Sequence, residues 1–423
     1  MHLDTNAAVA SDAVDAPDLR LMVFGLFFAF GGITSLNDVI IPKLKGLFTL
    51  GYGEAMLVQS AFFAAYFIIS MPASAIVKRL GYLRTAAIGL LTMTVGCLLF
   101  IPASSSGTFT VFLGALFVLA AGITIIQVVS NPLISLLGPP ATASSRLTFA
   151  QAFNSLGTTI FPYVGAMLIL GGLATVDPAT LSGLALDQYR TAETRVIVHT
   201  YLGLAAALMV IAAVLWIRRN RLKERQATDV PLLQAFTLLR RPRFAFGAAC
   251  IFFYVGAEVA IGSLLVVYLM QGDVMALAGE AAGKHVAFYW GGAMVGRFIG
   301  AGLLRLIAPG KLLAMVATGS ILLILLSANS VGPVSGWAYL AIGLCNAIMF
   351  PTIFSLASEG LGARAAEGSG IICMAIVGGA IVPPLTGHLA DLAGLRVALV
   401  LPALCYAIIL AFGIYARRPV GHI

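Results

Sequence analysis

Two carboxyl residues, Asp38 and Glu258, stand in the middle of long apolar runs. An ionisable group surrounded by hydrocarbon is costly and usually faces a water-filled passage or a bound substrate. Because burial favours the neutral form of a carboxyl, such a group can load and release a proton as its surroundings change. The same oxygens can also bind Na⁺. We expect Asp38 to couple the movement of a cation, with H⁺ favoured over Na⁺, and Glu258 to bind substrate; burial of either carboxyl for packing alone is the alternative.

Uncharged amides accompany the two carboxyls. Gln127 and Asn131 are four residues apart and Gln151 and Asn154 are three apart, so each pair shares one face of a helix. Amides carry both donors and acceptors, which suits the hydroxyl groups of a sugar. Hydrogen bonding between helices is the alternative for each amide. The predicted substrate-binding residues are Asn37, Gln127, Asn131, Gln151, Asn154, Glu258, Trp290 and Asn346.

Aromatic and cationic residues add to this picture. Tyr254, Tyr289, Trp290 and Phe350 could stack on the apolar face of a pyranose, although Tyr289 and Trp290 fit equally well in the aromatic belt of a membrane interface. We expect Arg297 and Arg305 to anchor the cytoplasmic end of their helix. These residues must be positioned by apolar elements, and the composition indicates which kind.

Apolar residues make up 60% of the 423-residue chain and charged residues 10%, whereas soluble domains carry about 25% charged residues. The bilayer must therefore be the solvent for most of the chain. The apolar runs are continuous and long enough for membrane helices, because a helix needs about 20 apolar residues to cross. We predict twelve spans, at residues 21–48, 55–77, 85–104, 108–137, 145–171, 195–217, 244–271, 285–307, 311–328, 334–361, 367–390 and 395–416.

When the chain is traced through these spans, the loops rich in basic residues all fall on the same side of the membrane. The positive-inside rule then places both termini and the basic loops in the cytoplasm. It also explains the net charge of +8 without a nucleic-acid partner, since these side chains meet an anionic leaflet. The basic residues that support this topology are Lys78, Arg79, Arg84, Arg218, Arg219, Arg221, Lys223, Arg225, Arg240, Arg241, Arg243, Arg417 and Arg418.

The two halves of the chain share landmarks. Asp38 and Glu258 are separated along the chain by nearly the same distance as Pro132 and Pro351. We therefore predict an all-α membrane protein with twelve transmembrane helices in two pseudo-symmetric six-helix bundles. The predicted divisions are a disordered cytoplasmic tail, an N-terminal bundle, a cytoplasmic linker and a C-terminal bundle, at residues 1–19, 20–217, 218–243 and 244–423.

Cysteines and histidines give no sign of a metal site or an enzyme. The five cysteines lie in apolar stretches without metal-ligand spacing, and the five histidines do not cluster in the sequence. We predict no metal, no cofactor beyond the coupling cation, and no enzymatic activity.

Several strings resemble the fucose:proton symporter family of the major facilitator superfamily, and most closely its bacterial glucose/galactose transporter branch. The resemblance covers residues 20–416 and implies two parallel six-helix halves around a central site. It implies import of a glucose- or galactose-like hexose by symport across the bacterial inner membrane, by a monomer, with Asp38 as the first-span aspartate. The strings that carry it are Ser35–Pro42, Gln59–Phe63, Thr124–Val128, Ser130–Pro132, Ala143–Thr148, Ala150–Thr159, Tyr254–Val259 and Phe350–Leu356.

Two positions depart from the family's fucose permease. Gln127 stands where that protein has a glutamate, and Glu258 stands where it has an amide. Gln127 cannot titrate, so L-fucose is not the predicted substrate. The alternatives to symport are a facilitative sugar uniporter and a drug:proton antiporter of the same fold.

Overall fold

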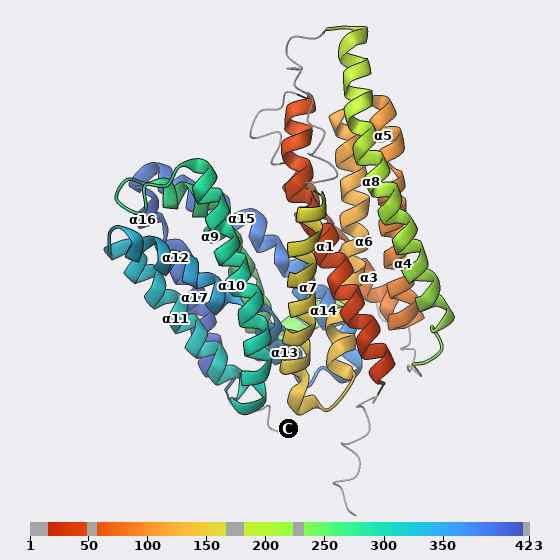
Figure 1. Ribbon diagram of the computed structural model, residues 1–423. Coiled ribbons are helices and arrows are strands. Elements are labelled where there is room, and N and C mark those ends of the chain that lie inside the picture. The colour runs from red at the N-terminus through yellow and green to blue at the C-terminus, as the bar shows by residue number, and fades with distance from the viewer. Residues whose placement is uncertain (1–15, 49–56, 166–181, 223–231, 418–423) are drawn as a thin grey trace, which may run out of the picture.

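The computed structural model describes residues 16–48, 57–165, 182–222 and 232–417, which are almost entirely helical (Figure 1). The first half contains α1 (Pro17–Phe48), α3 (Leu57–Leu80), α4 (Tyr82–Leu98), α5 (Phe100–Ser106), α6 (Phe109–Leu136), η2 (Pro140–Thr142), α7 (Ala143–Gly165) and α8 (Leu184–Ile217). The second half contains η5 (Leu232–Arg240), α9 (Pro242–Met270), α10 (Gly279–Leu306), α11 (Pro309–Asn329), α12 (Pro333–Asn346), α13 (Met349–Ser358), η6 (Gly362–Arg364), α14 (Ala365–Met374), η7 (Ala375–Val377), α15 (Gly378–Ala393), α16 (Leu395–Ala398) and α17 (Val400–Tyr415).

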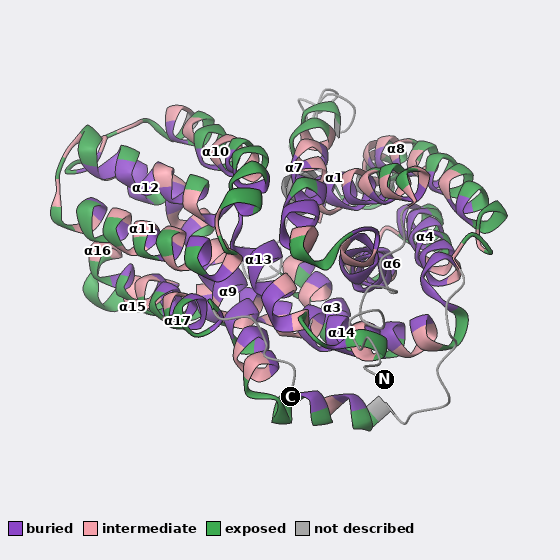
Figure 2. Cartoon of the chain, turned by 90° about the horizontal axis from the view of Figure 1, so that it is seen from below, coloured by how far each residue is buried: buried purple, intermediate pink, exposed green. Residues whose placement is uncertain are grey.

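The helices form two bundles, one from α1 to α8 and one from α9 to α17 (Figures 1 and 2). Within the first, α1 packs on α7, and α4 packs on α6 and α8. Within the second, α9 packs on α15 and α17, and α11 packs on α12 and α17. The bundles meet at one end of the molecule and diverge towards the other (Figure 1). The predicted domain divisions stay predictions; α1 already begins at Pro17, and η5 lies inside the segment predicted as a linker.

Ten helical stretches in the described part of the chain are long and apolar enough to cross a membrane. They correspond to ten of the twelve predicted spans. The other two predicted positions are occupied by α7 and α10, which carry more polar residues and pack against each other across the bundles. A helix that faces another bundle rather than lipid can tolerate polar side chains, so the lower hydropathy of these two helices follows from where they lie.

Close helix packing depends on small residues, as expected in lipid. A side chain at Gly157 of α7 would collide with the carbonyl oxygen of Phe28 in α1. A side chain at Gly378 would likewise collide with the carbonyl oxygen of Phe252 in α9. These glycines let the backbones of neighbouring helices touch.

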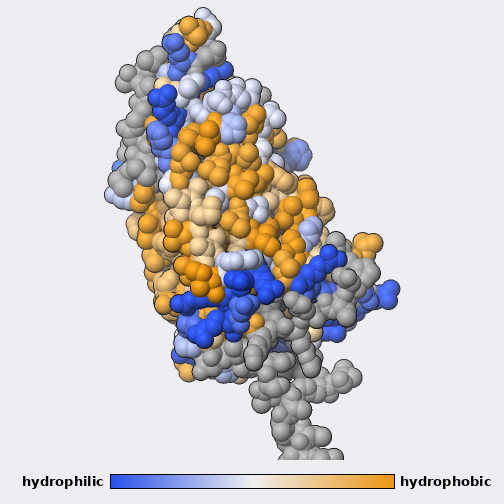
Figure 3. Space-filling view, turned by 90° about the vertical axis from the view of Figure 1, so that its right-hand side faces the viewer, coloured by the Kyte–Doolittle hydropathy of each residue, from blue (hydrophilic) through white to orange (hydrophobic). Residues whose placement is uncertain are grey.

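The surface has a broad apolar middle with hydrophilic residues gathered towards its ends (Figure 3). Apolar side chains with large exposed fractions, such as Phe67, Ile68 and Leu325, belong to this lipid-facing area. Both described chain ends lie at the end where the bundles meet (Figure 1). We call it the basic end, because its helix ends and loops carry Lys78, Arg79, Arg218, Arg219, Arg221, Arg240, Arg241, Arg243 and Arg417.

Candidate functional site

The C-terminal bundle holds a connected polar cluster inside its apolar interior. The half-buried Glu258 of α9 lies within reach of the hydroxyl of Tyr254, one turn earlier, and the positive charge of Arg297 in α10 acts on its carboxylate. The Tyr254 hydroxyl also donates to the carbonyl oxygen of Asn346 at 3.1 Å. The side-chain amide of Asn346 donates to the hydroxyl of Tyr289 at 2.8 Å. Two predicted site residues, Glu258 and Asn346, are therefore brought into one cluster.

A helix break creates part of this cluster. The tenth span is divided, because α12 ends at Asn346 and α13 begins at Met349. A broken helix leaves carbonyl oxygens without intrahelical partners, and these must be satisfied by other groups. Tyr254 bonds the carbonyl of Asn346, and the guanidinium of Arg297 donates to the carbonyl of Ala347 at 3.3 Å. Discontinuous helices of this kind often form the binding sites of secondary transporters.

The N-terminal bundle presents its own polar groups on α6. The hydroxyl of Tyr66 in α3 donates to the side-chain oxygen of Gln127 at 2.6 Å. Asn131, one turn further along, is completely buried; its side chain lies beside the thiol of Cys373 and has no nitrogen or oxygen partner among the described residues. Buried amides without partners are rare, because each costs the loss of its hydration. Asn131 therefore remains a good candidate for binding a polar ligand or a water molecule.

The two predicted amides of α7 behave differently from each other. The side chain of Asn154 donates to the carbonyl of Phe27 in α1 at 3.2 Å. This bond is the helix-to-helix alternative considered above, and it accounts for the position of Asn154 without a substrate. Gln151 is buried, and its backbone carbonyl accepts a hydrogen bond from Arg297 of the other bundle at 3.3 Å.

Arg297 is the residue that sequence reasoning placed wrongly. It does not anchor a helix end but reaches across to α7, where it donates to the hydroxyl of Ser155 and to the carbonyl of Gln151. One guanidinium thus links both bundles and acts on Glu258. The available signal was the spacing on α10, where Trp290, Arg297 and Ala301 recur at helical intervals on one face.

Trp290 shares the face of α10 that turns towards α7. On this face Met294 lies beside the hydroxyl of Thr159, and the carbonyl of Ala301 accepts a hydrogen bond from Ser145 at 2.7 Å. Trp290 lies further from the basic end, is 45% exposed, and packs edge-on against Tyr289. Tyr254 and Tyr289 are fully buried, so in this conformation they act through their hydroxyl groups and Trp290 keeps an accessible ring.

The backbone of Asn37 and Asp38 belongs to α1, but their side chains lie outside the described residues. The roles predicted for these two residues stay predictions, as do the substrate contacts of the other predicted residues.

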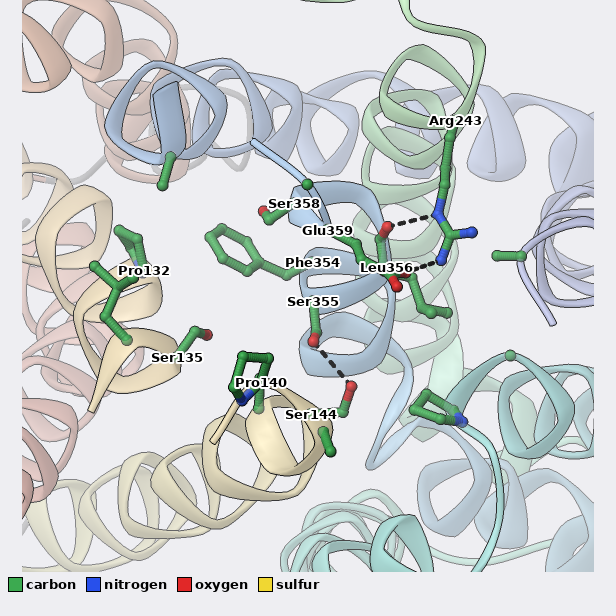
Figure 4. A pocket seen from close by; sticks show the side chains of 18 of the residues that line it. Pro132, Ser135, Pro140, Ser144, Arg243, Phe354, Ser355, Leu356, Ser358 and Glu359 are labelled. Carbon is green, nitrogen blue, oxygen red and sulfur yellow. Dashed lines mark hydrogen bonds and ion pairs between the residues drawn. The ribbon is translucent and has the colours of Figure 1, made fainter. Parts of the chain in front are cut away.

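The basic end is closed by direct contacts between the bundles. The ammonium of Lys78 in α3 binds the carboxylate of Glu367 in α14 at 2.6 Å. The hydroxyl of Ser369 donates to the carbonyl of Val128 in α6 at 2.8 Å. Ser144 and Ser355 share a 2.9 Å hydrogen bond beside a cavity of about 470 Å³, which both bundles line (Figure 4). All of these contacts would have to break for this end to open.

Two helical bundles with an apolar outer surface, polar clusters on their facing helices and one closed end define a multi-pass membrane transport protein. The chain matches the family model described as Major Facilitator Superfamily over residues 22–376. It belongs to that superfamily.

Named relatives cover nearly the whole chain. It is 47% identical over 393 residues to a glucose/galactose transporter of Brucella abortus, covering 93% of this chain and 92% of the relative. It is 34% identical over 409 residues to the L-fucose-proton symporter of Escherichia coli, covering 92% and 91%. Among solved structures, a crystal structure of the transporter FucP in the outward conformation superposes with a TM-score of 0.86 at 31% identity, covering 95% of this chain and 99% of that chain.

Proposed function

We propose that the protein is a secondary active transporter that imports a glucose- or galactose-like hexose together with a cation. The observation that carries the proposal is the cluster of Glu258, Tyr254, Asn346 and Arg297 on facing helices of an apolar bundle. Carboxylate and amide groups suit sugar hydroxyls. The relation to a protein named glucose/galactose transporter supports this class of substrate.

The coupling cation is proposed to be H⁺, carried by Asp38. A protein named L-fucose-proton symporter is among the relatives, and Asp38 is an ionisable residue inside the first span. Gln127 cannot bind a proton, and its side-chain oxygen already accepts a hydrogen bond from Tyr66, so only its NH₂ group is proposed to donate to a sugar hydroxyl. Glucose or galactose is favoured over L-fucose because of the 47% identity to a protein named glucose/galactose transporter.

Transport follows from alternating access. Sugar and cation enter where the bundles diverge, the bundles rock, and the contacts of the basic end break so that both leave there. The positive-inside rule supports a cytoplasmic basic end with both termini inside the cell, in the bacterial inner membrane. Binding can drive the change only if the loaded site has different affinities in the two conformations. No covalent bond forms or breaks.

The proposal is tested by uptake into proteoliposomes. Labelled glucose, galactose, mannose, L-fucose and N-acetylglucosamine are offered separately under an imposed H⁺ gradient, an imposed Na⁺ gradient, or neither. We expect glucose or galactose to accumulate under the H⁺ gradient. Equal uptake with and without gradients would indicate a uniporter, and extrusion of dyes without sugar uptake would indicate a drug antiporter.

A further inference from the structure

Arg297 of α10 lies close to a carboxylate that it does not bind. Its positive charge acts on Glu258 of α9, yet no ion pair joins the two side chains in the described part of the chain. The guanidinium donates instead to the Ser155 hydroxyl and the Gln151 carbonyl, both in α7 of the other bundle, and to the carbonyl of Ala347. Opposite charges attract strongly where water is scarce. The other bundle therefore holds Arg297 away from its counter-charge.

The two charged groups meet at the break between α12 and α13. The hydroxyl of Tyr254, which lies within reach of Glu258, donates to the carbonyl of Asn346 at 3.1 Å. Arg297 donates to the next carbonyl along the chain, that of Ala347, at 3.3 Å. Both side chains are thus anchored at the same place in one bundle, and rotation of their torsions can bring them together.

Small residues fix this part of α10 to its own bundle. A side chain at Gly296 would collide with Ala347, and a side chain at Gly300 would collide with Ile348. Packing this close leaves α10 little freedom to slide past α12 and α13. When the bundles rock, Arg297 therefore moves with the C-terminal bundle and away from α7.

Opening of the basic end separates Arg297 from its partners on α7. The two helices pack against each other across the seam, and the hydroxyl of Ser145 donates to the carbonyl of Ala301 at 2.7 Å, between Arg297 and the basic end. Rocking that breaks this bond also draws α7 away from Arg297. The carboxylate of Glu258 stays on the same side of the seam as the guanidinium.

We propose that Arg297 exchanges partners during transport and thereby sets the affinity of the site for sugar. With the basic end closed, α7 holds Arg297, and the oxygens of Glu258 accept hydroxyl groups of the sugar. With the basic end open, Arg297 pairs with Glu258 and competes with the sugar for those oxygens. This inference rests on the proposed function, in which Glu258 binds sugar.

The exchange gives the two conformations different affinities. A guanidinium can bind both oxygens of a carboxylate, which leaves few acceptor sites for a sugar hydroxyl. Loss of one hydrogen bond to a charged acceptor weakens binding about tenfold. The sugar is therefore bound tightly where the bundles diverge and is released more readily at the basic end, as import requires.

The first test measures equilibrium binding of labelled galactose to the full-length protein in detergent. Ser155→Ala removes a partner of Arg297 on α7, whereas the matched control Ser145→Ala removes a bond between the same two helices that does not involve Arg297. We expect Ser155→Ala to weaken binding about two- to fivefold, through loss of one neutral hydrogen bond, and Ser145→Ala to bind as the parent does. In Arg297→Gln, addition of Ser155→Ala should have no effect.

The second test compares the two sides of the membrane. In sealed vesicles of opposite orientation, exchange by the parent should be half-saturated at an about tenfold higher galactose concentration when the sugar is offered at the basic end. In Arg297→Gln this ratio should approach one, because the competing guanidinium is gone. A ratio taken within one variant does not depend on any overall loss of affinity.

Equal effects of Ser155→Ala and Ser145→Ala, or an unchanged ratio in Arg297→Gln, would overturn the proposal. A weakening by Ser155→Ala that persists in Arg297→Gln would show that Ser155 acts without Arg297, and would overturn it too. The two serine variants decide the matter alone if Arg297→Gln does not fold. A parent that binds none of the five sugars would overturn the proposed function as well, so the two failures are distinguishable.

Discussion

Loss of the ion pair between Lys78 and Glu367 should open the basic end. The pair joins α3 of one bundle to α14 of the other at 2.6 Å, and the two side chains are only 11% and 5% exposed. Exposed ion pairs contribute about 0–1 kcal/mol, whereas a hydrogen bond to a charged group that is largely shielded from water contributes about 1.5–3 kcal/mol. Arg364, from the same bundle as Glu367, donates to the other carboxylate oxygen at 2.7 Å and would remain in Lys78→Met.

We therefore use the lower part of that range. Lys78→Met should destabilise the closed basic end by about 1.5–2 kcal/mol, which increases the population of the open form about ten- to thirtyfold. Glu367 keeps Arg364 as a partner in both the closed and the open form. The Arg364–Glu367 contact therefore contributes nothing to the free-energy difference between the two forms.

A native cysteine reports this opening. Cys373 is fully buried in α14, beside Asn131 of the other bundle. Its rate of alkylation by a small maleimide, followed by peptide mass spectrometry at one fixed pH, should rise by the same factor in Lys78→Met. Arg218→Met is the matched control, because it removes a pairing within the first bundle, between Arg218 and Asp18. An unchanged Cys373 rate in Lys78→Met, or an equal rise in the control, would refute the reasoning.

Three further variants test other parts of the proposal. Asp38→Asn should abolish accumulation of sugar against its gradient while leaving sugar exchange in place, and continued accumulation would remove Asp38 from the coupling role. Glu258→Gln should weaken sugar binding about tenfold, through loss of a charged acceptor, as measured by equilibrium binding of labelled galactose; unchanged affinity would place Glu258 outside the site. A side chain at Gly370 would lie 2.8 Å from the Cβ of Ser74 across the bundles, so Gly370→Ala should strain the closed end by about 1–3 kcal/mol and speed alkylation of Cys373, whereas Gly291→Ala, which enters open space, should not.

The sequence predicted the helical membrane fold correctly, because the bilayer constrains composition directly. Long uncharged runs can only be internally hydrogen-bonded helices there. The number of membrane spans was harder to predict from the sequence. Ten described stretches meet the length and hydropathy of a span, whereas α7 and α10, at the other two predicted positions, do not, so the predicted number of twelve stays a prediction.

The candidate site was only partly predictable. Glu258 and Asn346 were singled out because a polar group in an apolar run is conspicuous in one dimension, and they do lie in one cluster. Asn154 has the same appearance in sequence, yet it bonds the backbone of α1. Residue type alone cannot separate a ligand-binding amide from one that joins two helices, since both need the same donors and acceptors.

By itself, then, the sequence determined that the bilayer surrounds most of this protein, which segments are helical, and the few positions where polar chemistry is possible. Only the tertiary structure decided which end is closed and that Arg297 spans the seam to Ser155. The reason is physical. Hydrophobicity and helix formation depend on neighbours along the chain, whereas these contacts join residues more than a hundred positions apart, and the packing of the two bundles alone brings them together.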